Sequence, residues 1–154
     1  ASDVYKRQVY NADNALADTC RITGASVANY TAAPVYADGA ARGRHQWLIE
    51  WNTPPASVEA FADELDRQLQ RQNSDYQAKR TGGIFLDRLS ITTARPGLFD
   101  DWLASTGKLG GQRKVPRLAN DRTTIEAILK LNTPKNAEYS EPSENSKKYP
   151  DGNS

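Results

Sequence analysis

Apolar positions along the chain predict seven elements of secondary structure. Four segments repeat apolar side chains every three or four positions, which is typical of helices with one buried face: residues 9–23, 57–71, 98–106 and 121–131. Three segments are rich in β-branched and aromatic residues or alternate apolar with polar positions, which is typical of strands: residues 26–36, 44–51 and 84–94. The predicted order is helix, strand, strand, helix, strand, helix, helix.

Turn residues join the first two strands into a hairpin. Asp38 and Gly39 stand between them, and an Asp-Gly pair between two strand patterns indicates an antiparallel connection. We therefore predict a small α+β domain, in which helices pack on one face of a three-stranded, mainly antiparallel sheet.

The helix predicted over residues 57–71 has a narrow apolar stripe. Ser57 precedes it as an N-cap, and the stripe consists of Val58, Phe61, Leu65 and Leu69. We predict that its acidic residues face solvent: Glu59, Asp63, Glu64 and Asp66. After this helix we expect a short helical turn over residues 73–80, with Tyr76 packed inward.

The two ends of the chain differ from the part between them. Residues 1–8 resemble the translation of an adapter used in shotgun sequencing libraries, so we exclude them from the fold and expect a longer natural protein upstream. Residues 132–154 contain three prolines and few apolar side chains, and this composition predicts a disordered tail. One folded domain over residues 9–131 remains.

Composition excludes several classes of protein. Twenty basic residues against nineteen acidic ones give a net charge of +1, which does not favour a nucleic-acid or membrane binder. No apolar run approaches the roughly 18 residues of a membrane span. One cysteine, Cys20, and one histidine, His45, cannot form an intrachain disulfide or a structural zinc site, and we predict no metal ligands.

A basic, glycine-containing loop is the strongest chemical signal in the sequence. Residues 108–122 carry five basic side chains and one acidic one, and Gly110 and Gly111 allow a ligand to approach the backbone closely. Such a loop suits an anionic, phosphate-bearing ligand. The alternative is a separate module that binds a polyanion or nucleic acid through residues 108–122, although this stretch has no aromatic side chain for stacking on bases.

The same loop resembles the C-terminal motif of bacterial members of the Gretchen Hagen 3 (auxin-responsive promoter) family. The resemblance rests on residues 107–120, and further segments match in the same order along the chain: residues 31–34 (Thr-Ala-Ala-Pro), 45–51, 73–80 and 97–102. It covers about residues 9–131.

This resemblance implies an ATP-dependent acyl-acid amido synthetase of the acyl-adenylate-forming superfamily. Such an enzyme adenylates a carboxylic acid and transfers the acyl group to an amine, such as an amino acid. The chain would be its mobile C-terminal domain, which is inactive alone. Its partners would be the missing N-terminal domain, which binds most of the ATP and Mg²⁺, a small carboxylic acid and an amine. We expect a cytoplasmic enzyme that binds neither nucleic acid nor membrane.

The resemblance also implies roles for single residues. Lys114 would reach the phosphates during adenylation and is the predicted catalytic residue. Gln112 and Arg117, together with Gly111, would orient the loop or contact the nucleotide. His45 and the pair of residues 79–80 are further candidates without an assigned role.

Overall fold

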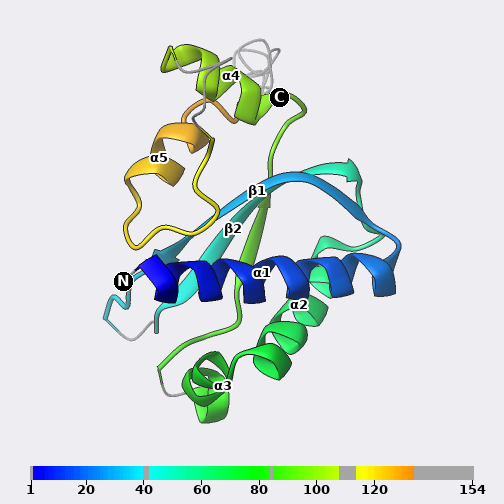
Figure 1. Ribbon diagram of the computed structural model, residues 1–154, viewed down its shortest axis with the longest axis vertical. Helices are drawn as coiled ribbons and strands as arrows, with labels where there is room; N and C mark the ends of the chain where they lie inside the picture. The colour runs from blue at the N-terminus through cyan, green and yellow to red at the C-terminus, as the bar shows by residue number, and fades with distance from the viewer. Residues whose placement is uncertain (1, 40–41, 84, 108–113, 134–154) are drawn as a thin grey trace, which may run out of the picture.

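The computed structural model describes residues 2–39, 42–83, 85–107 and 114–133 (Figure 1). They form five α-helices, one short 3-10 helix and three strands. In chain order these are α1 (Ser2–Thr23), β1 (Ser26–Val35), β2 (Arg44–Thr53), α2 (Val58–Gln72), α3 (Ser74–Arg80), η1 (Thr81–Gly83), β3 (Ser90–Thr93), α4 (Leu98–Ser105) and α5 (Thr123–Leu129). The predicted order of elements is confirmed, and α1 continues the helix predicted from residue 9 back to Ser2.

The sheet has the strand order β1-β2-β3 and is mixed. The predicted hairpin is confirmed, because β1 and β2 pair antiparallel with Ala32 opposite Trp47. β3 instead runs parallel to β2, with Trp47 opposite Ile91, since the chain crosses through α2 and α3 before it returns. β3 is also shorter than the strand predicted over residues 84–94.

Helices cover both faces of the sheet, so the expectation of a single covered face is wrong. Successive residues of β2 point to opposite sides. Trp47 and Ile49 pack with α1 and α2 in one core, and Leu48 packs with α4 and α5 in a second core. Figure 1 shows α1 and α2 on one side of the strands and α4 and α5 on the other.

α2 forms as predicted, but not all its charges face solvent. The Ser57 hydroxyl accepts a hydrogen bond from the Ala60 N–H at 3.1 Å, and Phe61 and Leu65 are fully buried. Asp66, by contrast, is 4% exposed and accepts hydrogen bonds from Tyr76 and Arg80 of α3. Its placement on the solvated face is therefore wrong, whereas the inward packing of Tyr76 is confirmed.

α4 begins at a glycine in the left-handed region. Gly97, the N-cap of α4, has a φ of 82°, and its N–H donates to Glu50 Oε2 of β2 at 2.8 Å. This contact ties the second helical layer to the central strand.

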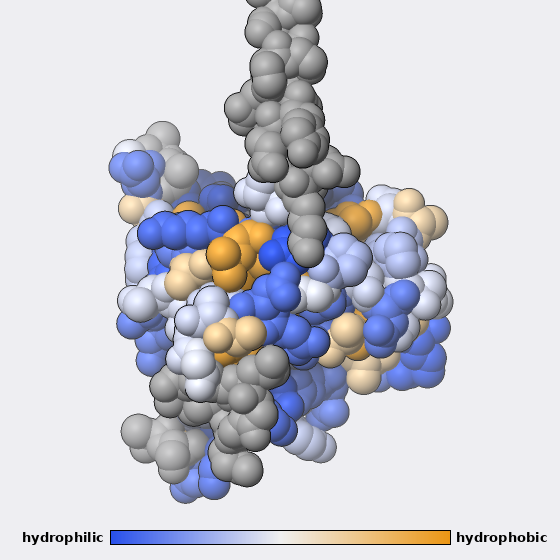
Figure 2. Space-filling view, turned by 90° about the horizontal axis from the view of Figure 1, so that it is seen from above, coloured by the Kyte–Doolittle hydropathy of each residue, from blue (hydrophilic) through white to orange (hydrophobic). Residues whose placement is uncertain are grey.

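Seen from above, the surface is largely hydrophilic with small hydrophobic patches (Figure 2).

Candidate functional site

The segment that follows the glycine-containing loop is fixed along the outer edge of β1. The Ala32 N–H donates to the Arg117 carbonyl at 2.8 Å, and the Ala119 N–H donates to the Ala32 carbonyl at 3.1 Å. The Thr31 hydroxyl donates to the Pro116 carbonyl at 2.7 Å. Residues 116–119 thus have a defined backbone position. Gly111 and Gln112, two of the predicted site residues, lie outside the described residues.

A cleft of about 690 Å³ lies beside this segment. Its walls come from the second half of α1, the start of β1, α4 and residues 114–117. Apolar side chains form much of the lining, and they include Leu16, Cys20, Val27, Leu103 and Val115. Its charged lining residues are Asp13, Asp100, Lys114 and Arg117.

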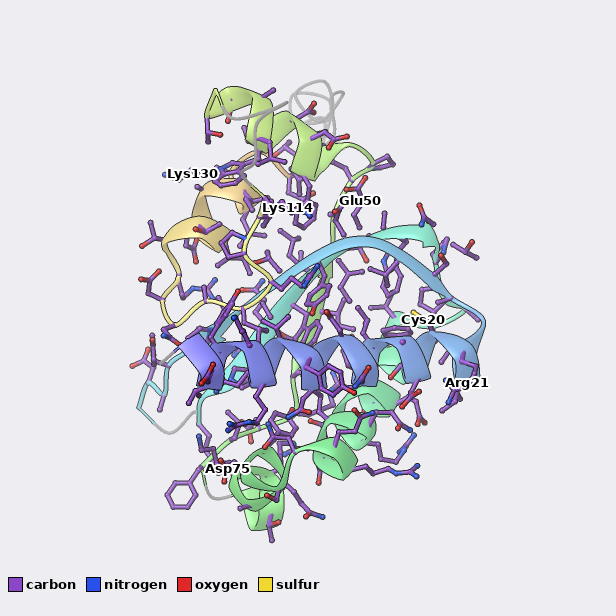
Figure 3. The ribbon with its side chains drawn as sticks, in the orientation of Figure 1. Cys20, Arg21, Glu50, Asp75, Lys114 and Lys130 are labelled. Carbon is purple, nitrogen blue, oxygen red and sulfur yellow. The ribbon has the colours of Figure 1, made fainter. Side chains whose placement is uncertain are left out.

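Lys114 is an exposed cation at this cleft. Figure 3 places it in the space between the sheet and the α4 and α5 layer. Among the ion pairs of the described residues, none involves Lys114. An ammonium group in this position suits an anion brought to the cleft from outside.

Arg117, the second predicted contact, is engaged with α1. Its Nη1 lies 3.3 Å from Asp13 Oδ2. Asp13 Oδ1 also accepts a hydrogen bond from the Tyr30 hydroxyl at 2.6 Å. Burial and the neighbouring Asp13 carboxylate raise the pKa of Tyr30 far above its ordinary value, so this hydroxyl remains a donor. This arrangement favours an orienting role for Arg117.

Arg122, at the end of the basic stretch, has an internal structural role. It donates to Glu126 at 2.6 Å, to Gln46 Oε1 at 2.8 Å and to the Pro34 carbonyl at 3.1 Å. Of the three basic side chains in residues 114–122, two therefore form ion pairs within the domain. This finding weakens the alternative of a broad polyanion-binding surface.

Comparison with known proteins identifies the family. The sequence model of the GH3 family C-terminal domain matches residues 10–123, about three quarters of the chain. The chain belongs to the GH3 family. A search of curated proteins finds no match.

Two solved structures share the fold of this GH3 domain. One is "AtGH3.15 acyl acid amido synthetase in complex with 2,4-DB", with a TM-score of 0.62 and 16% sequence identity. The other is "GH3.15 acyl acid amido synthetase", with a TM-score of 0.60 and 17% identity. The matches cover 82% and 79% of this chain but 23% of each matched chain. The chain thus spans under a quarter of the length of these relatives.

His45 and the pair at residues 79–80 of the GH3 domain are not part of the Lys114 cleft. His45 stacks on Tyr76 with ring centroids 6.0 Å apart and lines a separate cavity of about 180 Å³. Burial, followed by the charge of Lys79, lowers the pKa of His45. Arg80 is not available for an anion in this conformation, because its guanidinium pairs with the buried Asp66 at 2.8 Å.

Sequence reasoning missed two residues that hold the segment next to Lys114. Thr31 belongs to a matched motif, which was a usable signal, although its hydrogen bond to Pro116 had no signature in the sequence. Asp13 carried no signal at all.

The described residues contain no group of three side chains suited to a metal ion, and none of the helices among them has the length and apolarity to span a membrane.

Proposed function

We propose that this GH3 domain is the mobile C-terminal domain of an ATP-dependent acyl-acid amido synthetase. The proposed enzyme adenylates a small carboxylic acid and then forms an amide bond between the acyl group and an amine such as an amino acid. Membership of the family supports this function, as does the fold shared with two structures that are titled acyl acid amido synthetases.

The observation that carries the proposal is the position of Lys114. Its side chain is exposed at the cleft, while the backbone two residues further on is hydrogen-bonded to β1. A cation held in this way can stabilise charge that develops on a phosphate more than it stabilises the bound substrates. We therefore assign Lys114 as the catalytic residue.

The other parts of the proposed site fit this assignment. Arg117 orients the segment through Asp13, and Gln112 and Gly111 are proposed to lie close to the nucleotide. ATP, as a substrate, would supply the leaving pyrophosphate. Lys114 suits its phosphates. As the family resemblance implies, we assign Mg²⁺ and most of the nucleotide to an N-terminal domain of the same chain, without which this domain is expected to be inactive.

The test compares Lys114→Ala with the parent enzyme in the full-length protein. ATP–pyrophosphate exchange should slow by roughly a hundredfold, because one charged contact to the transition state is lost. The affinity for the acid should change little. Lys130→Ala is the matched control, since Lys130 is an exposed lysine at the end of α5 (Figure 3). Unchanged exchange in Lys114→Ala would refute the assignment.

A further inference from the structure

Two sequence motifs that lie far apart in the chain meet in the structure. Residues 31–34 lie in the second half of β1, and residues 116–119 lie along its outer edge. Leu118 forms a parallel bridge with Ala32, and Arg122 reaches the Pro34 carbonyl from the end of the same stretch. The Thr-Ala-Ala-Pro motif therefore provides the surface on which the segment after Lys114 docks.

Among the hydrogen bonds of the described residues, the one from the Thr31 side chain lies closest in sequence to Lys114. Its hydroxyl donates to the Pro116 carbonyl, two residues after Lys114, and its side chain is 1% exposed. The buried Thr31 hydroxyl has little access to water as an alternative partner, so it favours this hydrogen bond to the Pro116 carbonyl. Thr31 thus fixes where the segment that follows Lys114 contacts β1.

Asp13 supports the same segment from α1. It joins the Tyr30 hydroxyl and the Arg117 guanidinium, and it does so on the cleft side of β1. The carboxylate and the Thr31 hydroxyl hold consecutive residues, Arg117 and Pro116, from two different elements. The Thr31 hydrogen bond and the half-exposed Asp13–Arg117 ion pair thus contact the segment at two adjacent residues.

We propose that Thr31 is a positioning residue for Lys114, with Asp13 as its support. This inference rests on the proposed function, because it assumes that Lys114 acts in adenylation. Thr31 contacts neither substrate nor nucleotide in this scheme. It acts by keeping the ammonium group of Lys114 within reach of the phosphates, and displacements of about 1 Å are enough to slow an enzyme substantially.

The kinetic test uses Thr31→Val in the full-length enzyme. Valine keeps the volume of threonine and removes the hydroxyl. We expect the maximal rate of ATP–pyrophosphate exchange to fall about tenfold with little change in KM for the acid. Thr31→Ser, which keeps the hydroxyl, should recover most of the rate. The double variant Thr31→Val with Lys114→Ala should be no slower than Lys114→Ala alone, because Thr31 acts through Lys114.

Thr19→Val is the matched control for a general loss of stability. Thr19 is also fully buried, and its hydroxyl donates to a main-chain carbonyl, that of Ala15, at 2.7 Å. It lies within α1 and makes none of the contacts to residues 116–119. We expect Thr19→Val to leave the exchange rate within about twofold of the parent enzyme, even if it lowers stability as much as Thr31→Val.

A second measurement uses the 154-residue chain and does not depend on catalysis. Hydrogen exchange of the Ala119 amide, which donates to Ala32, should accelerate in Thr31→Val, and ¹⁵N relaxation should report a more mobile Lys114 amide. Unchanged exchange and relaxation at these amides would overturn the positioning role.

The two proposals fail in different ways. If Lys114→Ala slows pyrophosphate exchange and Thr31→Val does not, the positioning role is refuted and the proposed function stands. If Lys114→Ala has no effect, the proposed function is refuted, and so is the proposal that Thr31 positions Lys114 for adenylation. If the loss in the double variant exceeds that of Lys114→Ala, Thr31 acts independently of Lys114 and the inference is overturned.

Discussion

The buried carboxylate of Asp66 links α2 to α3. It accepts one hydrogen bond from the Tyr76 hydroxyl, three from the Arg80 guanidinium and one from the Gln70 amide. Arg80 also donates to the Leu86 carbonyl at 3.1 Å, so the same cluster reaches the chain before β3. The buried carboxylate of Asp66 is stabilised only as long as the guanidinium of Arg80 pairs with it.

Asp66→Asn should lower the free energy of unfolding by about 3 kcal/mol, because it leaves the guanidinium of Arg80 partly buried without a countercharge. Urea denaturation of the parent chain and the variant measures this difference. Asp63→Asn is the control, since Asp63 pairs with Arg88 at an exposed position and should cost less than about 1 kcal/mol. Equal effects of the two variants would contradict the structural role of Asp66.

His45 predicts a pH dependence of stability. Burial and then Lys79 lower its pKa in the folded chain, whereas the unfolded chain has the ordinary value of about 6.5. As the pH falls below about 6.5, the unfolded state binds a proton on His45 before the folded state does. The contribution of His45 to the free energy of unfolding is therefore complete above about pH 6.5, and it is lost as the pH falls toward the lower pKa of the folded state.

The measurement is urea denaturation at about pH 7.5 and about pH 5.5, compared with His45→Gln. His45 is the single histidine of the chain, so the variant isolates its contribution. Glutamine does not titrate, and the loss of stability between the two pH values should therefore be smaller. The same pH dependence in both proteins would show that His45 is not responsible.

At the scale of elements, Gly97 shows where local backbone geometry decides how a helix begins. Its φ of 82° belongs to the left-handed region, and a Cβ added there would have no atom within 4 Å. A residue that replaces Gly97 would therefore strain the backbone without a steric clash of its Cβ. The N–H of Gly97 still donates to Glu50, which holds α4 against β2.

Gly97→Ala should cost about 1–2 kcal/mol of stability, measured by thermal or urea unfolding, because an L-residue is strained in this region. Gly97→Asn should cost less, since asparagine tolerates left-handed backbone better than alanine does. If both substitutions were neutral, the left-handed start of α4 would not be required.

Local signals predicted most of the elements, and contacts between distant residues explain what they missed. The cap and stripe of α2 are encoded within residues 57–69, so that helix was predictable. The direction of β3, the second helical layer and the burial of Asp66 depend on where other elements pack. In the site, the resemblance pointed to Lys114, but the bond between Thr31 and Pro116 spans 85 residues and has no local pattern.

The whole molecule is nearly neutral, and this limits what it can bind. Its net charge is +1, and Arg117 and Arg122 of the basic stretch form ion pairs with Asp13 and Glu126. Long polyanions are attracted mainly by several cations acting together.

We expect the chain to bind a DNA or RNA oligonucleotide more weakly than about 100 μM at physiological salt. Fluorescence anisotropy with labelled single and double strands measures this. Tighter, salt-sensitive binding that Lys114→Ala weakens would instead support the polyanion-binding alternative.

The segment along β1 has a consequence for aggregation. An uncovered edge strand presents main-chain donors and acceptors on which another molecule can add a strand. Here Ala32 exchanges hydrogen bonds with Arg117 and Ala119, so part of that edge is already occupied. Displacing residues 116–119 would expose this part of the edge to intermolecular pairing. The segment next to Lys114 therefore also protects the domain from aggregation.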